Sequence, residues 1–315
     1  MVTESISDSI VERPTKEQLF IISEELNGDD SKTEDLKILV QQWIALDPSI
    51  PNNLNKTFVT NVIRLTKHNV ERTKDKLKNY LIMKSYCKDI FFNRNPMSPE
   101  IERVMKTVNI CISPKLTKEC GRIFYFSLWN DNPDNFVVED VLKYTFMIID
   151  AATAIDTHTC GEVVIYDCKN VTLAHIPKLI RCFNLASEIL LKAYPCRLKE
   201  VHVVNPLPVV EKVISLARNI LPKKVKDKFY IHKDFKSLHE KIDPSLLTST
   251  YDGELPSLSV MSEELNQRLR RFAPLFKEQE SLKYLGPVTE KNNQSFAHLK
   301  DQIGVEGSFR KLDID

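Results

Sequence analysis

The feature that most constrains the fold of this 315-residue chain is an alternation that begins after residue 98. Short apolar runs bounded by turn-forming residues are separated by long segments with helical periodicity. Strands that alternate with helices favour an α/β domain with a largely parallel sheet, covered by helices on at least one face. The predicted strands are 108–112, 123–128, 163–166, 201–204 and 229–231, and the predicted helices between them are 136–157, 173–193 and 208–221.

The chain before residue 96 has helical patterns and no predicted strand. One of its helices is predicted to begin at Ser31, because Ser31 and Glu34 have capping-box spacing. The run Asn-Arg-Asn-Pro at 93–96 ends the helical region. We therefore predict a disordered tail over 1–12, a helical lobe over 13–95, an α/β domain over 96–258, and a C-terminal part over 259–315 whose helix, from Met261 to about residue 283, packs on the body.

Glycine and cysteine usage excludes several classes of protein. The seven glycines form no GxGxxG, GxxxxGK[ST] or GxSxG motif, which argues against nucleotide-dependent and serine-hydrolase chemistry. The seven cysteines are odd in number and include no CxxC pair, so we expect reduced thiols, and neither a disulfide framework nor a metal site. We expect no enzymatic activity and no cofactor.

Charge and hydropathy indicate the cellular location of the protein. The net charge is +1, so an attraction to nucleic acid or membrane needs a local basic patch. The sequence contains no basic patch with interleaved aromatic residues, the pattern that would indicate nucleic-acid binding. The N-terminus is polar and acidic, unlike a signal peptide, and no segment approaches the roughly 20 apolar residues of a membrane span. We expect a cytoplasmic protein that associates with membranes peripherally.

Two predicted helices carry patterns with more than one interpretation. Helix 208–221 is amphipathic, and four lysines follow it between 223 and 228. It is either a lid whose basic neighbours contact anionic lipid heads, or a helix that packs on the sheet beside solvated lysines. Helix 136–157 is apolar around most of its circumference, so it is either a core helix or the wall of a cavity.

The ionisable residues form no recognisable catalytic set. His202 and His232 lie within apolar strands and are interpreted as structural. Asp167 follows a strand, where ligands often bind in α/β folds, but it has neither a second acid nor a glycine loop beside it.

Several ordered motifs resemble one known family. They are VIRLTKHNVERTKDKLKNYLIMKSYCKDIFFNRNP (62–96), GEVVIYDCKN (161–170), LLKAYPCRLKEVHVVNPLPVVEKVISLARNILPKKVKDKFYIH (190–232) and LLTSTYDGEL (246–255). Over about 35–260 the chain resembles the CRAL-TRIO (Sec14-like) lipid-binding family, in particular the branch of alpha-tocopherol transfer protein and cellular retinaldehyde-binding protein. The resemblance implies a helical lobe, a mostly parallel sheet that floors a lipid cavity, and a mobile gate helix at 208–221.

The resemblance also implies which residues bind. The implied ligand-binding residues are Leu142, Thr145, Phe146, Ile149, Val163, Ile165, Phe183, Ala186, Ile189, Leu190, Tyr194, Val209, Val213, Ile214 and Ala217. The implied contacts to a phosphoinositide or membrane are Arg197, Lys224, Lys228 and Lys67, the last beside Thr66, which stands at a usually basic position. The family's Tyr-Gly-Gly turn is Tyr251-Asp252-Gly253 here, and Asp is among the residues that tolerate a left-handed backbone.

The sequence and the resemblance together favour an intracellular carrier. Its cargo would be one small hydrophobic ligand of the isoprenoid, tocopherol, retinoid or carotenoid class, exchanged at anionic membranes that hold phosphoinositides. Two alternatives remain open: a Sec14-type phospholipid or phosphoinositide exchange protein, and a membrane-trafficking adaptor that docks lipids without moving cargo.

Overall fold

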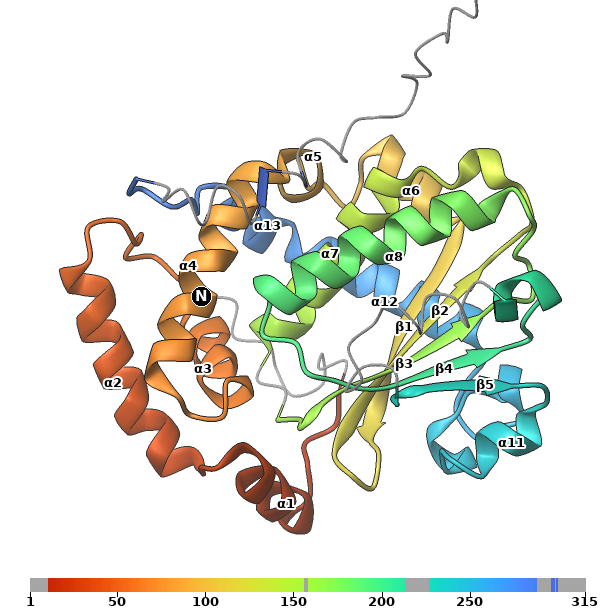
Figure 1. Cartoon of the computed structure of the whole chain (residues 1–315), viewed down its shortest axis with the longest axis horizontal. Coiled ribbons are helices and arrows are strands. Elements are labelled where there is room, and N and C mark those ends of the chain that lie inside the picture. Colours follow the sequence, from red (N-terminus) through yellow and green to blue (C-terminus); the bar gives the residue numbers. More distant parts are fainter. Residues whose placement is uncertain (1–10, 156–157, 213–226, 288–295, 298, 300–315) are drawn as a thin grey trace, which may run out of the picture.

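The computed structural model describes residues 11–155, 158–212, 227–287, 296–297 and 299. Most of the predicted tail at 1–12 and most of the predicted gate helix at 208–221 lie outside these residues. Within them, helices α2 to α4 gather on one side of the molecule and a sheet on the other, with α7 and α8 between (Figure 1).

Five strands form one sheet in the described part of the chain, in the order β1-β2-β3-β4-β5. They are β1 (Val108–Leu116), β2 (Gly121–Leu128), β3 (Gly161–Asp167), β4 (Leu198–Val204) and β5 (Phe229–His232). β1 and β2 form an antiparallel hairpin, and each later pair is parallel. The prediction of a largely parallel sheet is confirmed, with α7 (Val138–Ala154) joining β2 to β3 and α8 (His175–Lys192) joining β3 to β4.

The two faces of the sheet carry different side chains, because successive residues of a strand point to opposite sides. One face, here called the α8 face, holds Phe124, Phe126, Val164, Tyr166, Val201, Val203, Phe229 and Ile231 by register. The ring of Phe183 on α8 lies 6.4 Å from that of Phe229, which places α8 over this face.

The opposite face, here called the α11 face, holds Ile123, Tyr125, Val163, Ile165, His202, Tyr230 and His232. It lies under α11 (Phe235–His239) and the turns that follow: the Nδ1 of His232 is 3.2 Å from the hydroxyl of Ser237, and the Tyr125 hydroxyl donates to the carbonyl of Leu246 at 2.6 Å. Both faces of the sheet are therefore covered, as expected for a mainly parallel sheet.

The helical lobe consists of α1 (Lys16–Leu26), α2 (Asp30–Leu46), α3 (Lys56–Leu65), α4 (Val70–Tyr86) and α5 (Lys88–Phe91), and α6 (Pro99–Met105) leads into β1. Polar caps set where these helices begin. Thr15 and Gln18 form a capping box at α1, and Asn69 caps α4. The predicted start of α2 at Ser31 is wrong: the Asp29 carboxylate accepts from Lys32 N at 2.9 Å, so the helix begins at Asp30.

The C-terminal part contains α12 (Leu258–Leu269) and α13 (Ala273–Glu280), separated by a 3₁₀ turn at Arg270–Phe272. The single helix predicted here is thus two helices. Pro274 explains the break, because it lacks an N–H and is tolerated only in the first turn of a new helix.

The turn at Tyr251-Asp252-Gly253 confirms one expectation directly. Asp252 has φ 55° and ψ 32°, the left-handed conformation that the sequence predicted it would tolerate. Gly253 is required for another reason, since a Cβ there would lie 2.2 Å from the carbonyl oxygen of Leu247.

Arg94, which is fully buried, connects the helical lobe to α7 and α13. Its guanidinium donates to Asp150 on α7 at 2.5 Å and to the side chain of Gln279 on α13 at 2.7 Å. Lys84 on α4 is also fully buried and donates to the carbonyl of Gln279. One continuous apolar core runs from α2 to α13 around these groups.

Candidate functional site

Apolar side chains on the α8 face of the sheet, on α8 and on neighbouring segments pack against the core yet stay half-buried. They are Phe124, Phe126 and Tyr166 on the sheet, Ile149 on α7, Leu179, Cys182, Phe183, Ala186 and Leu190 on α8, and Leu207 and Val210 after β4. On the α11 face, by contrast, Ile123, Tyr125 and Ile165 are completely buried. On the α8 face Val201, Val203 and Phe229 are buried too, so the half-buried side chains of that face lie mainly on β2 and β3.

The half-buried surface is nonetheless deep in the molecule. Burial raises the pKa of the Tyr166 phenol, and it raises the pKa of the Cys182 thiol to about 12. These side chains therefore combine partial accessibility with strong desolvation.

The spacing of the apolar residues along α8 gathers them on one side of the helix. Leu179, Phe183, Ala186 and Leu190 follow one another at intervals of four, three and four residues, which places them on one side of a helix. Leu185 and Ile189 lie on the neighbouring stripe and are completely buried. Of the α8 residues predicted to bind ligand, Phe183, Ala186 and Leu190 keep accessible surface and Ile189 does not.

Helix α7 brings its predicted residues toward α8. An ion pair between Glu139 and Arg181 joins the two helices, and Leu142, Phe146 and Ile149 follow Glu139 at helical spacing. Leu142 and Phe146 are buried, whereas Ile149 is half-buried. Thr145 is buried and donates its hydroxyl hydrogen to the carbonyl of Val141 at 2.7 Å, so that hydrogen is used within the helix.

Tyr194, just after α8, is fully buried among other rings. Its ring lies 5.0 Å from that of Phe146, and its hydroxyl donates to the Asp150 carboxylate at 2.9 Å. The structure thus places Tyr194 in the network around Arg94.

The structure puts the two predicted floor residues on the side of the sheet away from α8. Val163 and Ile165 lie on the α11 face and are 3% and 0% exposed, while Val164 and Tyr166 lie on the α8 face. The sequence did not separate them, because 163–166 is apolar at every position, as is common in buried parallel strands. Val164, Tyr166, Phe124 and Phe126, which lie on the α8 face, are not among the residues predicted from the sequence.

The segment after β4 is described only at its start. Residues 208–212 are helical, and Val209 is half-buried there. Val213, Ile214, Ala217 and Lys224 lie outside the described residues.

A cluster of basic residues lies where α8 ends and β4 begins. Arg197 and Lys199 form ion pairs with Glu25 of α1, at 3.3 Å and 2.9 Å. Lys228 donates to the carbonyl of Leu198, and its pKa is lowered by burial and by the charge of Arg197. The Nη1 of Arg197 is buried and has no hydrogen-bond partner in the described part of the chain. Two of the predicted headgroup residues, Arg197 and Lys228, are therefore neighbours.

The remaining predicted basic position lies on the turn between α3 and α4. Lys67 has φ 60° and is half-buried, and it precedes His68, whose Nδ1 is 2.9 Å from the carbonyl of Leu26 at the end of α1. Thr66 is buried and donates to the carbonyl of Val62 at 2.8 Å, so its side chain points into the lobe.

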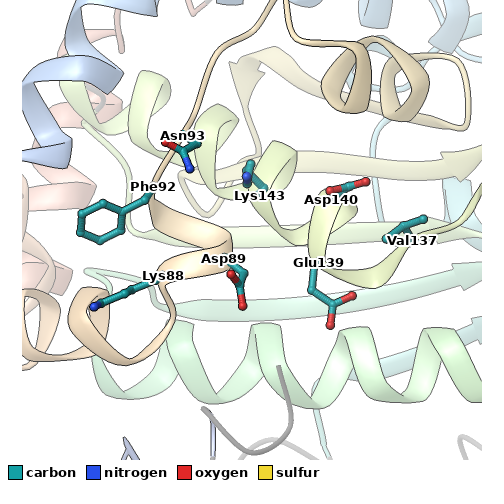
Figure 2. A pocket seen from close by; sticks show the side chains of 8 residues that line it. All are labelled: Lys88, Asp89, Phe92, Asn93, Val137, Glu139, Asp140 and Lys143. Carbon is teal, nitrogen blue, oxygen red and sulfur yellow. The ribbon is translucent and has the colours of Figure 1, made fainter. Parts of the chain in front are cut away.

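A separate open groove of about 720 Å³ runs between α5 and the start of α7 (Figure 2). Its lining consists of Lys88, Asp89, Phe92, Asn93, Val137, Glu139, Asp140 and Lys143. Both signs of charge face this groove, and it contains none of the predicted ligand-binding residues.

The other ionisable candidates have structural partners. The Nδ1 of His202 and the Nε2 of His232 are 2.9 Å apart, and the second nitrogen of His202 is 3.0 Å from Glu200. Asp167 accepts from the backbone of Lys169 at 2.9 Å and from Asn205 at 2.8 Å. No three His, Cys, Asp or Glu side chains in the described ranges are grouped to hold a metal ion.

Comparison with known families identifies this architecture. A family model described as CRAL/TRIO domain matches residues 106–253, which span the whole sheet, α7 and α8. The chain carries a CRAL/TRIO domain. A second family model, described as Pinta-like, UBA domain, matches residues 29–101 in the helical lobe that precedes it.

Relatives of this CRAL/TRIO protein are similar at low identity. An alpha-tocopherol transfer protein-like protein of Homo sapiens is 22% identical over 211 residues, 65% of this chain and 60% of the relative. Clavesin-2 of Homo sapiens is 26% identical over 137 residues, 42% of this chain and 41% of the relative. The crystal structure of Sfh5 matches with a TM-score of 0.48 and 11% identity, over 83% of this chain and 98% of that one.

The match to the first of these relatives spans about 60% of its length. A helical region followed by an α/β domain with a mostly parallel five-stranded sheet matches the CRAL-TRIO fold. Among the described helices, none has both the length and the apolar character that crossing a bilayer requires.

Proposed function

We propose that this protein is an intracellular carrier that binds one small hydrophobic ligand between α8 and the sheet and exchanges it at anionic membranes. The observation that carries the proposal is the half-buried apolar surface of Phe126, Tyr166 and Phe183, which lies deep in the molecule. Such a surface gains free energy by contacting an apolar guest. A ligand that buries ten to fifteen carbons would gain roughly 8–12 kcal/mol, at about 0.8 kcal/mol per CH₂.

The residues that we expect to touch the ligand follow from this geometry. Ile149, Phe183, Ala186, Leu190, Val209 and Val210 keep accessible surface. Val164 and Tyr166 take the place of Val163 and Ile165 as the floor, because they face α8. The ligand class (isoprenoid, tocopherol, retinoid or carotenoid) is supported by the name of the alpha-tocopherol transfer protein-like relatives. The gate role of 208–221 remains a prediction.

The membrane contact is proposed for Arg197, Lys228 and, outside the described residues, Lys224. Arg197 and Lys228 lie close together, and an Arg or Lys near an anionic surface contributes about 1 kcal/mol to binding. A phosphoinositide headgroup would suit this cluster, because the buried Nη1 of Arg197 has no acceptor among the described residues. The same cluster supports the second candidate, a phospholipid or phosphoinositide exchange protein.

The proposal is tested by placing a bulky side chain on the half-buried stripe of α8. Ala186→Trp adds a large side chain on the half-buried stripe, and Asn184→Trp adds the same side chain at an exposed position of the same helix. We expect Ala186→Trp to slow transfer of fluorescent tocopherol or retinol between vesicles at least tenfold, and Asn184→Trp to leave it near the wild-type rate.

Three results would contradict the carrier proposal. If no member of a broad lipid panel co-purifies with the wild-type protein or raises its melting temperature, it carries no such ligand. If phospholipids alone do so, the exchange protein is the right interpretation. If Ala186→Trp still binds anionic vesicles as the wild type does while neither protein transfers lipid, the adaptor interpretation holds instead.

A further inference from the structure

Two cysteines meet beneath α1, at the ends of two neighbouring strands. Cys120 precedes β2 and Cys160 precedes β3, and the next residues of both strands, Gly121 and Gly161, are register partners. The backbone N–H of Cys160 donates to the carbonyl of Cys120 at 2.8 Å, and the two side chains belong to the same small buried cluster. Both are free and completely buried.

This arrangement suits a disulfide. Neighbouring strands lie about 4.8 Å apart, and disulfides join residues whose Cα atoms are about 4.4–6.8 Å apart. Cys120 and Cys160 share one small cluster of buried side chains, so a local rearrangement of the two side chains would bring the sulfur atoms together.

Helix α1 covers this pair through a small cluster of its own. Ile22 and Leu26 pack on Leu116 and the two cysteines, and this cluster is separate from the main core. The Cys120 thiol donates to the carbonyl of Gln18 in α1 at 3.6 Å. The other side of α1 is open, with Phe20 67% and Ile21 39% exposed. Because α1 buries few side chains, it can open locally while the main core stays folded.

We propose that Cys120 and Cys160 are a redox-reactive dithiol, which a peroxide converts to a disulfide when α1 lifts from the strand ends. One thiolate attacks hydrogen peroxide, the O–O bond breaks, and a sulfenic acid and water form. The second thiol attacks the sulfenic sulfur, the S–O bond breaks, and a second water leaves. Two thiols lose two electrons and two protons, and one peroxide becomes two waters.

The docked helix keeps this dithiol unreactive. Burial and the nearby Glu25 raise the pKa of the Cys160 thiol to about 12, and burial also raises the pKa of Cys120. Since the thiolate is the nucleophile, reaction has to follow the opening of α1. Oxidation then removes the thiol hydrogen that Gln18 accepts, so the oxidised form holds α1 less tightly.

The test uses the full chain. The reduced protein is treated with hydrogen peroxide, its remaining thiols are alkylated with N-ethylmaleimide in a denaturant, and the peptides are mapped by mass spectrometry without reduction. We expect one cross-linked pair that contains Cys120 and Cys160, with the other five cysteines alkylated. Cys120→Ser removes the cross-link, whereas Cys168→Ser keeps it.

A matched pair of variants on α1 tests the role of the helix. Ile22→Ala removes a buried side chain from the cluster and is expected to speed cross-linking at least fivefold, while Ile21→Ala, at the exposed neighbouring position, leaves the rate unchanged. Circular dichroism checks that both variants fold. Oxidation that stops at single sulfinic acids, a cross-link to a different cysteine, or equal rates in the two variants would overturn the proposal.

Discussion

At the scale of single residues, the guanidinium of Arg94 is a buried charge whose stability depends on its partners. It is completely buried, and the carboxylate that neutralises it, Asp150, is buried as well. Gln279 and the hydroxyl of Tyr194 complete the hydrogen bonds of this pair. Breaking a buried ion pair from one side leaves a charge with neither water nor partner, which costs more than the intact pair contributes.

Asp150→Asn should therefore destabilise the protein by about 3–5 kcal/mol, because Arg94 keeps its charge and loses its counterion. Urea denaturation measures this loss. Asp131→Asn makes the same chemical change at an exposed position and should stay within about 0.5 kcal/mol of the wild type. A loss below about 1 kcal/mol in Asp150→Asn would show that water reaches Arg94.

Lys84 makes the stability of the protein depend on pH. Burial, followed by the charge of Arg94, lowers its pKa to about 7. In the unfolded chain a lysine has a pKa of about 10.4, so between these values the unfolded state binds more protons and the free energy of unfolding rises with pH. The stabilisation is complete above the unfolded pKa and is lost as the pH falls toward 7.

Replacing Lys84 by Met should remove this dependence. Between pH 7 and 8.5, the free energy of unfolding of the wild type should rise relative to that of Lys84→Met by up to about 1.4 kcal/mol per pH unit. Urea titrations of both proteins at several pH values measure the difference. Parallel pH profiles would mean that Lys84 stays charged in the folded protein.

At the scale of elements, the sequence predicted which strands exist but not which way their side chains point. Apolar runs between turn residues located all five strands of the described sheet, whereas the capping-box spacing at Ser31 did not locate the start of α2. Which face of β3 meets α8 needed the register with β2 and β4, because residues 163–166 are apolar on both sides. The contact of Glu25 with Arg197 joins residues 172 positions apart, and no local pattern predicts it.

Helix α1 places an acidic group on the proposed membrane-binding cluster. Burial raises the pKa of Glu25, but the hydrogen bond and charge of Lys199, with the charge of Arg197, outweigh that effect and lower it overall. Glu25 is therefore ionised at neutral pH and competes with a phosphate group for the same two cations.

Glu25→Gln should strengthen binding to vesicles that contain anionic lipid by up to about thirtyfold, since about 1 kcal/mol of attraction is released for each of the two basic residues freed. Co-sedimentation at fixed ionic strength measures the affinity. Glu24→Gln changes the net charge equally at an exposed position of α1 and should have a much smaller effect. Equal effects would show that net charge, and not this contact, controls binding.

At the scale of the whole molecule, the helical lobe and the CRAL/TRIO domain share one core. The apolar cluster extends from Val40 in α2 to Phe276 in α13 without a break, and Arg94 ties both parts to α7. Domains joined through a large apolar interface unfold together, whereas loosely linked domains do not.

The two tryptophans can show whether the two parts unfold together, because Trp43 lies in α2 of the helical lobe and Trp129 follows β2 of the CRAL/TRIO domain. Variants that keep only one of them, Trp43→Phe or Trp129→Phe, should show the same fluorescence midpoint in urea as the circular dichroism of the same variant. Phe276→Ala removes a buried ring of α13 and should lower both midpoints together, with a loss of about 3–5 kcal/mol in the free energy of unfolding. Separate midpoints would show two independent folding units.

The tie between Arg94 and Gln279 also has a consequence for synthesis, because the two residues are 185 positions apart. On a ribosome that adds roughly 5–20 residues per second, about 10–40 s pass between the synthesis of Arg94 and that of Gln279. During this interval the helical lobe contains a guanidinium whose final acceptor has not been translated. Nascent chains that stop before α13 are thus expected to depend on chaperones, however complete their sheet.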